Sequence, residues 1–228
     1  RSALYHTQAE YTFTPTFGKF VVGGNARLYA PNSRGTILED TGNVVIRNYE
    51  YGFYGGLEKR WMLDRIIMNI TTRVDKNQNF DFLVSPAASV VYKWTTDHVI
   101  RASFSSAIRN PTLADQYLYY DVGRATLLGN LNGYDSLITV ESFNDYRSVN
   151  LDLSALNYFN VDPIRPERAR TLELGYKGNI FDQSIFIDAG YYLTFYQDFI
   201  GFNIGLDASF DPVTRFPVGG IEAYRVAA

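Results

Sequence analysis

The sequence predicts an all-β fold, in which antiparallel strands follow one another in an up-and-down order, and three observations support this prediction. Successive segments of about eleven residues alternate apolar and polar side chains, as strands with one apolar face do. Short and long connections alternate between these segments. Aromatic residues make up 16% of the chain, with 18 Tyr and 16 Phe, and several lie beside the short connections. Together these features are typical of a transmembrane β-barrel.

The alternation is clearest in two strands between Ser85 and Arg109, which are joined by a tight turn at residues 95–97. In the second of them, one face carries Ile100, Ala102, Phe104 and Ile108, and the other carries Arg101, Ser103, Ser105 and Arg109. The remaining strands are expected at residues 3–13, 19–29, 46–60, 64–74, 168–177 and 184–198, and the start of a further strand at Glu222. We therefore expect a partial barrel of about eight strands plus the start of a ninth.

Strand length and the placement of aromatic residues both fit a membrane wall. Eleven residues at about 3.3 Å each, tilted by about 40°, cover roughly the 25 Å apolar band of a bilayer. Phe13, Trp61, Trp94 and Phe181 lie at or beside the short turns, where a barrel places an interfacial aromatic girdle. Alternatively, these residues lie at the edge of an ordinary core. In a membrane barrel the short turns face the periplasm and the long loops face the outside.

A long segment without a clean strand pattern begins at Asn110-Pro111. Proline restricts the backbone conformation of the residue before it and has no N–H group to donate to a neighbouring strand, so the strand ends here. It runs over residues 110–166 and is rich in Tyr, Asn, Asp and Leu. Loops this long are usually functional or disordered, and we expect this one to be ordered in part. This segment is predicted to contact a ligand or, alternatively, to pack against neighbouring loops. The candidate ligand-binding residues are Arg109, Tyr117, Tyr119, Tyr120 and Tyr134.

A charged inner wall is the second candidate site. The parity that faces the barrel interior carries Arg27, Arg65, Arg73, Arg101, Glu50, Glu58, Glu173 and Asp188. Of these, Arg73, Arg101 and Glu173 are the predicted ligand-binding positions. Two interpretations stay open: contact with solute or with a plug inside the barrel, and cross-strand ion pairing that keeps the wall hydrated.

Composition and motifs argue against several other functions. The formal net charge is −3, which shows no basic excess, so nucleic acid is not an expected partner. Cysteine is absent and the two histidines lie on separate strands. No catalytic motif appears, so we expect no enzyme activity and no cofactor. The run from Asp75 to Asp81 begins like a calcium loop, but Phe80 and Pro86 replace its glycine and glutamate, so no metal site is expected.

Five phrases in the chain carry a resemblance to a known family. They are GGLEKR (55–60), TTRVDKNQNFDFLVSPAASVVY (71–92), RASFSSAIRNPTLADQY (101–117), RPERARTLELGYKG (165–178) and IDAGYYLTFYQDFIG (187–201). In this order they resemble the barrel of TonB-dependent outer-membrane receptors, in the branch whose plug follows a carboxypeptidase-regulatory-like domain. The resemblance implies uptake of a scarce nutrient, such as a chelated metal, oligosaccharide or peptide, with energy delivered by the TonB complex.

The resemblance also implies partners that lie outside this sequence. Such transporters have about 22 strands around a plug, so residues 1–228 are expected to be one segment of a single barrel domain. An open sheet in lipid would leave backbone groups unsatisfied at both edges. We therefore expect the plug and the closing strands to come from elsewhere, with outer-membrane lipid and the TonB complex as further partners. A surface lipoprotein lid is left open.

Two other classes of protein remain as alternatives. The first is a passive porin-like channel or an outer-membrane enzyme barrel, which an upstream plug sequence would argue against. The second is a soluble β-rich binding module, which would bury the apolar faces of these strands in a closed core and would need no detergent.

Overall fold

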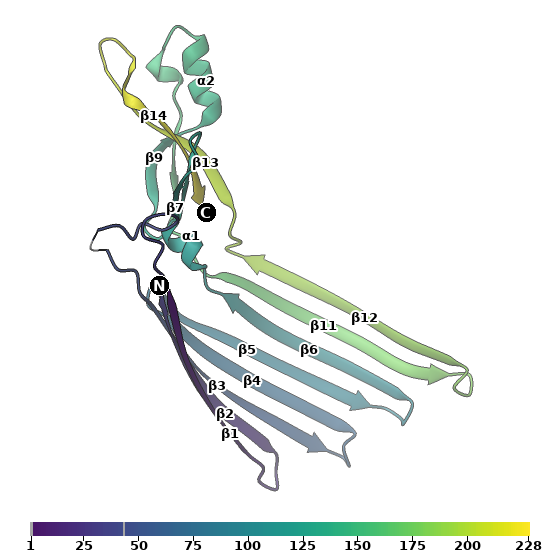
Figure 1. The fold of residues 1–228 in the computed structure, drawn as a ribbon. Coiled ribbons are helices and arrows are strands. Elements are labelled where there is room, and N and C mark those ends of the chain that lie inside the picture. Colours follow the sequence, from purple (N-terminus) through teal and green to yellow (C-terminus); the bar gives the residue numbers. More distant parts are fainter. Residues whose placement is uncertain (1, 43) are drawn as a thin grey trace.

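The computed structural model describes residues 2–42 and 44–228, whose strands form two sheets. The larger sheet has eight strands in the order β1-β2-β3-β4-β5-β6-β11-β12, all antiparallel, and we call it the wall. Its strands are β1 (Ala3–Phe13), β2 (Lys19–Ala30), β3 (Asn48–Trp61), β4 (Ile66–Asn77), β5 (Phe80–Lys93), β6 (His98–Arg109), β11 (Glu167–Ile180) and β12 (Ile185–Gln197). Figure 1 shows the wall as an open, curved sheet. The prediction of eight long strands in a partial barrel is confirmed.

The register lines up apolar residues of neighbouring strands on one face of the wall. Phe104 lies opposite Ala88 on one side and Leu172 on the other, and Leu172 lies opposite Leu193. Leu174, one step along the same face, is 58% exposed. The wall therefore presents a continuous apolar face to its surroundings, as a membrane wall does and a soluble sheet does not.

Four short turns connect strands at one end of the wall. They cover residues 14–18, 62–65, 94–97 and 181–184, and Figure 1 shows them gathered at the end farthest from the second sheet. At the opposite end, the strands expected to end at residue 74 and to begin at Ser85 are both longer than predicted, so the long connection that this gap implies is wrong. There β4 runs on to Asn77 and β5 begins at Phe80, because the Asn77 side chain accepts a hydrogen bond of 2.9 Å from the Asn79 amide and closes a tight turn.

The second sheet has six strands and replaces most of the expected long loop. Its order is β10-β9-β13-β14-β8-β7, with β14 and β8 parallel. The strands are β7 (Tyr119–Asp121), β8 (Thr126–Leu128), β9 (Tyr134–Ile138), β10 (Tyr158–Val161), β13 (Phe202–Phe210) and β14 (Pro217–Ala227). The residues from Glu222 onward thus belong to β14, and their interpretation as a ninth wall strand is wrong. They pair with β13 and β8 and not with the wall.

Three short helices lie in the same segment: α1 (Leu113–Tyr117), α2 (Val140–Ser148) and the 3-10 helix η1 (Leu153–Ala155). No helix within residues 2–42 and 44–228 has the length and apolar character to cross a membrane.

Among the described residues, half of the buried apolar side chains lie on strands of the second sheet, and α2 adds Tyr146. One cluster contains Leu128, Leu137 and Val226, and another contains Ile138 and Tyr146. This sheet therefore has a core of its own, which alternation along long strands could not reveal.

A third cluster joins the second sheet to the wall. Phe80, at the tip of the β4–β5 hairpin, packs with Ile164 and with Ala227 near the end of β14. The two sheets thus share an apolar contact at the end of the wall that carries the long connections.

The apolar face gives a first test. Ile70 lies on this face of β4, 45% exposed, and its neighbour Thr71 points to the other face. Ile70→Arg in the complete receptor should lower the free energy of unfolding by about 2–4 kcal/mol, because the arginine would lie near the bilayer midplane. Thr71→Arg, the matched control, should cost far less. Urea titration of the receptor in lipid vesicles measures both, and an equal loss in the two variants would contradict the assignment of faces.

The loop between β2 and β3 gives a second test. The Asp40 carboxylate accepts hydrogen bonds from the Ser33 hydroxyl and from the Gly35 amide, the latter 2.7 Å long, which lowers the pKa of Asp40 to about 2. The ionised Asp40 carboxylate therefore stabilises the folded loop. Because the folded pKa is depressed, this stabilisation is full above the ordinary pKa of 3.8 and is lost as the pH falls through 2.

Asp40→Asn should therefore speed trypsin cleavage after the exposed Arg34. The ratio of the cleavage rates of wild type and variant should stay constant from about pH 6 to pH 9, because Asp40 stays ionised over this range. Glu39→Gln, which changes the adjacent acid, is the control and should cleave like wild type. Peptide mapping by mass spectrometry locates the cut. A ratio that changes across this pH range would show that a different group orders the loop.

Candidate functional site

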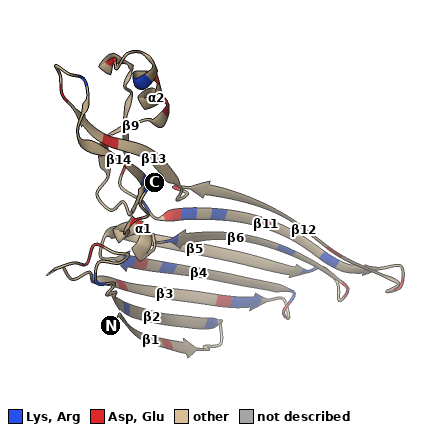
Figure 2. Cartoon of the chain, turned by 45° about the horizontal axis from the view of Figure 1, so that its top comes forward, with Lys and Arg blue, Asp and Glu red and all other residues tan. Residues whose placement is uncertain are grey.

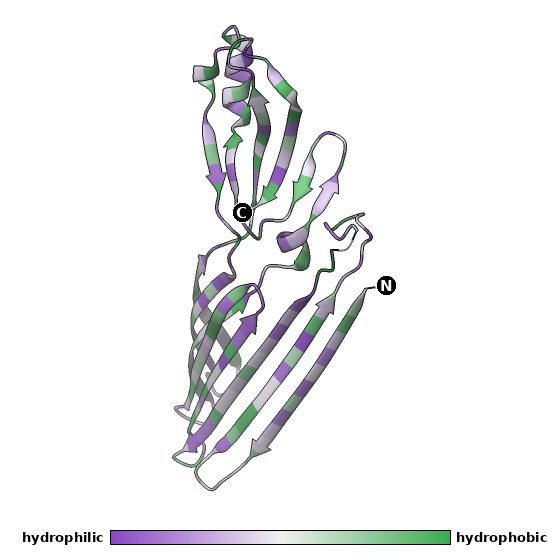
Figure 3. Ribbon diagram, turned by 90° about the vertical axis from the view of Figure 1, so that its left-hand side faces the viewer, coloured by the Kyte–Doolittle hydropathy of each residue, from purple (hydrophilic) through white to green (hydrophobic). Residues whose placement is uncertain are grey.

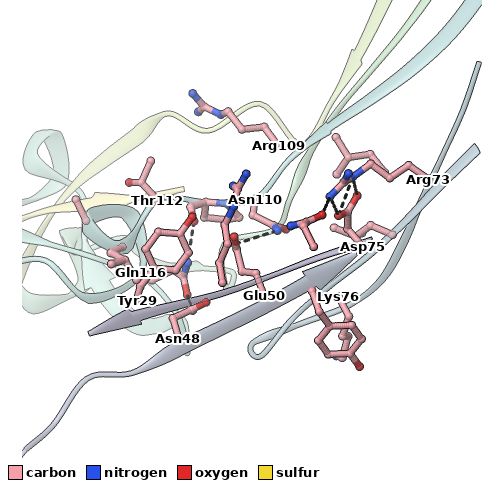
Figure 4. Close-up of a pocket in the computed structure, with 18 residues that line it drawn as sticks. Tyr29, Asn48, Glu50, Arg73, Asp75, Lys76, Arg109, Asn110, Thr112 and Gln116 are labelled. Carbon is pink, nitrogen blue, oxygen red and sulfur yellow. Dashed lines mark hydrogen bonds and ion pairs between the residues drawn. The ribbon is translucent and has the colours of Figure 1, made fainter. Parts of the chain in front are cut away.

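A cavity of about 680 Å³ lies at the end of the wall where the chain leaves β6 and enters α1, and we call it the rim cavity. Its floor is formed by β2, β3 and β4, and its side by the segment that leaves β6 and enters α1. The lining residues used below are Asn25, Arg27, Tyr29, Asn48, Glu50, Arg73, Asp75, Arg109, Asn110, Thr112 and Gln116. Figure 4 shows Glu50, Asn110 and Gln116 close together and Arg73 beside Asp75, with Lys76 lying apart on the other side of the strands.

Buried amide side chains fix α1 to the wall. Asn48 and Asn77 are each 1% exposed and exchange hydrogen bonds across β3 and β4, the shorter of them 2.8 Å. Gln116 of α1 accepts from Asn48 at 3.3 Å and from Asn79 at 2.7 Å, and it donates to the Pro111 carbonyl. Because buried amides need partners, this network holds the start of the long insertion against the strand ends.

The helix itself is begun by a capping box. The Thr112 hydroxyl accepts from the Asp115 amide at 3.1 Å, and the Asp115 carboxylate accepts from the Thr112 amide at 2.8 Å. These bonds satisfy helix-end donors and so set the direction in which the chain turns after Pro111.

The charges around the cavity are mostly paired. Arg73 binds Asp75, with its Nη2 atom 2.6 Å from Oδ1, and the same Nη2 atom donates to Asn25. Arg109 pairs with Glu167 of β11. Such pairs keep a polar face hydrated and ordered while they add little net charge.

Two groups in the cavity are left available for a solute. Arg27 makes no ion pair or side-chain hydrogen bond within the described part of the chain, although Glu50 lies opposite it in the register. The Asn110 Oδ1 atom is buried without a hydrogen-bond donor. A cation and an unsatisfied acceptor in one polar cavity can bind a solute that carries both acceptors and donors.

The predicted site residues fall into separate groups. Arg73 and Arg109 both line the rim cavity. Tyr117 is not part of its lining, and its hydroxyl accepts from Asn79 at 2.6 Å. Arg101 and Glu173 form an ion pair of 3.4 Å farther along the wall.

The three remaining tyrosines lie in the second sheet and away from the cavity lining. Tyr119 and Tyr120 are about half exposed on the short strand β7. Tyr134 packs against the core and donates to the Gly129 carbonyl, and burial raises its pKa. The structure therefore does not bring all eight predicted residues together.

The cavity also contains residues that carry no binding signal of their own in the sequence. Asn48, Asn110 and Gln116 are amides at strand or helix ends, which read as ordinary loop residues in a sequence. Arg27 was assigned only to the charged inner wall. A usable signal was present, because Arg27 and Glu50 have interior parity near the same end of their strands.

Figure 2 shows acidic and basic residues scattered along the wall strands, without a single-sign patch. Within the part of the chain that the structure describes, no group of three or more His, Cys, Asp or Glu side chains could hold a metal ion.

Comparison with known proteins identifies the family. The family model described as TonB dependent receptor-like, beta-barrel, matches residues 2–224, so this chain belongs to that family. Its members are outer-membrane barrels with a receptor or transporter role. No sequence among the curated proteins matches this chain.

Solved structures agree on the fold. The siderophore receptor PirA from Pseudomonas aeruginosa aligns with 100% of this chain and 37% of its own, at 14% identity and a TM-score of 0.58. The siderophore receptor PirA from Acinetobacter baumannii aligns with 99% of this chain and 31% of its own, at 13% identity and a TM-score of 0.59. This chain thus spans about a third of the length of these receptors.

The amide network gives a test of how α1 is held. Gln116→Ala in the complete receptor removes partners of Asn48 and Asn79, and leaving buried amides unpaired should weaken the local structure by about 1–3 kcal/mol. Faster amide hydrogen exchange over residues 112–118 reports this loss. Gln78→Ala, in the exposed turn beside the network, should leave that exchange unchanged. Equal protection in wild type and Gln116→Ala would show that other contacts hold α1.

Proposed function

We propose that this chain forms part of the outward entrance of an energised outer-membrane importer that takes up a scarce nutrient. In this proposal the long connections and the second sheet face outside, and the short turns face the periplasm. The observation that carries it is the rim cavity, which combines free binding groups with a position at the end of a wall belonging to this receptor family.

The side chains in the cavity indicate the chemistry of the solute. Arg27 offers a guanidinium, which suits carboxylates and other acceptor groups. Asn25, Asn110 and Thr112 add amide and hydroxyl groups that form hydrogen bonds in either direction. A chelated metal, an oligosaccharide or a peptide would each satisfy this set. Tyr119, Tyr120 and Tyr134 are proposed as further contacts for a solute that reaches the second sheet.

The paired charges on the inner face of the wall have a different proposed role. Arg73–Asp75, Arg101–Glu173 and Lys177–Asp188 line this face and provide polar packing for a plug. Solute would first bind at the rim cavity. Rearrangement of the plug, driven by TonB from the periplasmic side, would then let it pass along this wall.

This importer is distinguished from its alternatives by energy coupling. A passive channel would need no TonB, and an enzyme barrel would release a chemically changed product. The proposed function requires neither a cofactor nor a resident metal. A surface lipoprotein that closes over the second sheet is compatible with the proposal.

Arg27→Ala in the full-length receptor tests the proposal. Loss of one charged hydrogen bond should raise the solute concentration for half-maximal uptake about tenfold. Lys19→Ala removes a cation from the same strand and face at the short-turn end, and it should leave uptake unchanged. Cells that express only this receptor are supplied with labelled ferric chelates, oligosaccharides and peptides, with and without TonB.

The results separate the alternatives. Uptake that persists without TonB would identify a passive channel and contradict the importer. Uptake that depends on TonB but is equal in wild type and Arg27→Ala would remove the rim cavity from the pathway.

A further inference from the structure

The apolar face of the wall has an uneven distribution of charge. Within the described strands it carries no acidic side chain, and its cations lie only toward the two ends: Lys59, Lys76, Arg168 and Arg170. Acids and bases on the inner face, by contrast, are mixed and mostly paired. Because a membrane wall exposes its apolar face to lipid, cations near the two ends of this face lie at the height of lipid head groups.

A shallow hollow of about 700 Å³ lies on the apolar face across β1, β2 and β3, and we call it the lipid groove. Small residues form its floor, namely Ala9, Gly24 and Ala26, and the exposed rings of Tyr11, Tyr51 and Phe53 form its walls. A Cβ atom at Gly24 would lie 3.0 Å from the Phe53 ring, so glycine there keeps the groove open. Figure 3 shows hydrophobic and hydrophilic residues interspersed along the wall strands, as expected when only one face is apolar.

Lys76 lies next to the outward end of this groove. It is directly opposite Tyr51 in the register, and Tyr51 packs edge-on against Phe82 with centroids 6.5 Å apart. The Lys76 ammonium lies 5.6 Å from the centroid of the Phe82 ring and donates to the Phe80 carbonyl. Among the described residues no carboxylate comes within 4.0 Å of it, so its charge remains available.

The height of Lys76 fits the position of a head group. Ten residues of β4 separate it from Ile66, which lies opposite Trp61 beside a short turn. At about 3.3 Å per residue and a tilt of about 40°, this is roughly 25 Å, the thickness of the apolar band. Lys76 therefore lies at the far interface when Trp61 lies at the near one.

The same arrangement recurs on the other side of the wall. Arg170 is directly opposite the exposed ring of Phe195, and like Lys76 it has no acidic partner in the described strands. It lies eleven residues from Phe181 of the short turn, which is roughly 28 Å by the same geometry. A cation beside an aromatic ring at this height is therefore a repeated feature of the lipid-facing side.

We propose that the lipid groove and Lys76 form a binding site for a phosphate-bearing lipid of the outer leaflet. An acyl chain lies over Ala9, Gly24 and Ala26, and the lipid phosphate binds the Lys76 ammonium. Assignment to the outer leaflet uses the orientation proposed above, whereas the site itself depends only on the apolar face being in lipid.

Native mass spectrometry of the complete receptor in detergent tests this site, with bisphosphorylated lipid A as the probe. Wild-type receptor should retain the lipid, and enzymatically dephosphorylated lipid A should bind about fivefold more weakly, because one lysine–phosphate attraction is lost. Lys76→Gln should cause a similar loss. Ala26→Leu fills the groove and should reduce retention of both forms of the lipid.

Lys59→Gln is the matched control, because it removes a lysine from the same face at the short-turn end. Its retention of lipid A should equal that of wild type. The proposal is overturned if the dephosphorylated lipid binds wild-type receptor as tightly as lipid A does. It is also overturned if Lys76→Gln retains lipid A like wild type, or if Lys59→Gln loses as much as Lys76→Gln. Lipid retention in detergent does not depend on solute uptake. A negative lipid-binding result would therefore not contradict the importer proposal, which the uptake experiment with Arg27→Ala tests separately.

Discussion

The structure depends on one constraint, which is that backbone N–H and C=O groups in hydrocarbon must bond to each other. Each inner strand of the wall satisfies this requirement through ladders on both sides, from the β1–β2 pairs to the β11–β12 pairs. Only the free edges of β1 and β12 lack a neighbouring strand in the described sheet. Unpaired groups cost several kcal/mol each in lipid, so these two edges are where further strands of the barrel must join.

The same constraint explains how much of the fold could be predicted from sequence. A strand that crosses a membrane must be long and must place every second side chain in lipid, so β4, β6 and β11 display a pattern over many residues. Strands β7 and β8 have three residues each and are stabilised by packing in the second sheet. The parallel partner of β8 is β14, which lies about a hundred residues away, and no local pattern encodes such a pairing.

The candidate site was predictable only in part, for a related reason. Arg73 is predictable because strand parity places it on the interior face, and Arg109 because it stands where the long segment begins. The amides that shape the rim cavity carry no such signal, since Asn48 and Gln116 meet across 68 positions of sequence. Whether an amide is buried and bonded depends on what folds over it, and here that is α1. Likewise, the tight β4–β5 turn follows from the side chain of Asn77 and not from the polarity of its neighbours.

The two faces of the wall differ in how they handle charge, and this difference locates the membrane. On the wet inner face, opposite charges pair at short range, as Arg73 does with Asp75. On the lipid face, Lys59 contacts Phe17 and Trp61, and Lys76 contacts Phe82. Lys59 lies opposite Met68, so the two lysines are eight residues apart along β4, which is roughly 20 Å along the membrane normal at a strand tilt of about 40°. Because both side chains extend away from the bilayer centre toward water, their ammonium groups bracket a band close to the 25 Å expected of hydrocarbon.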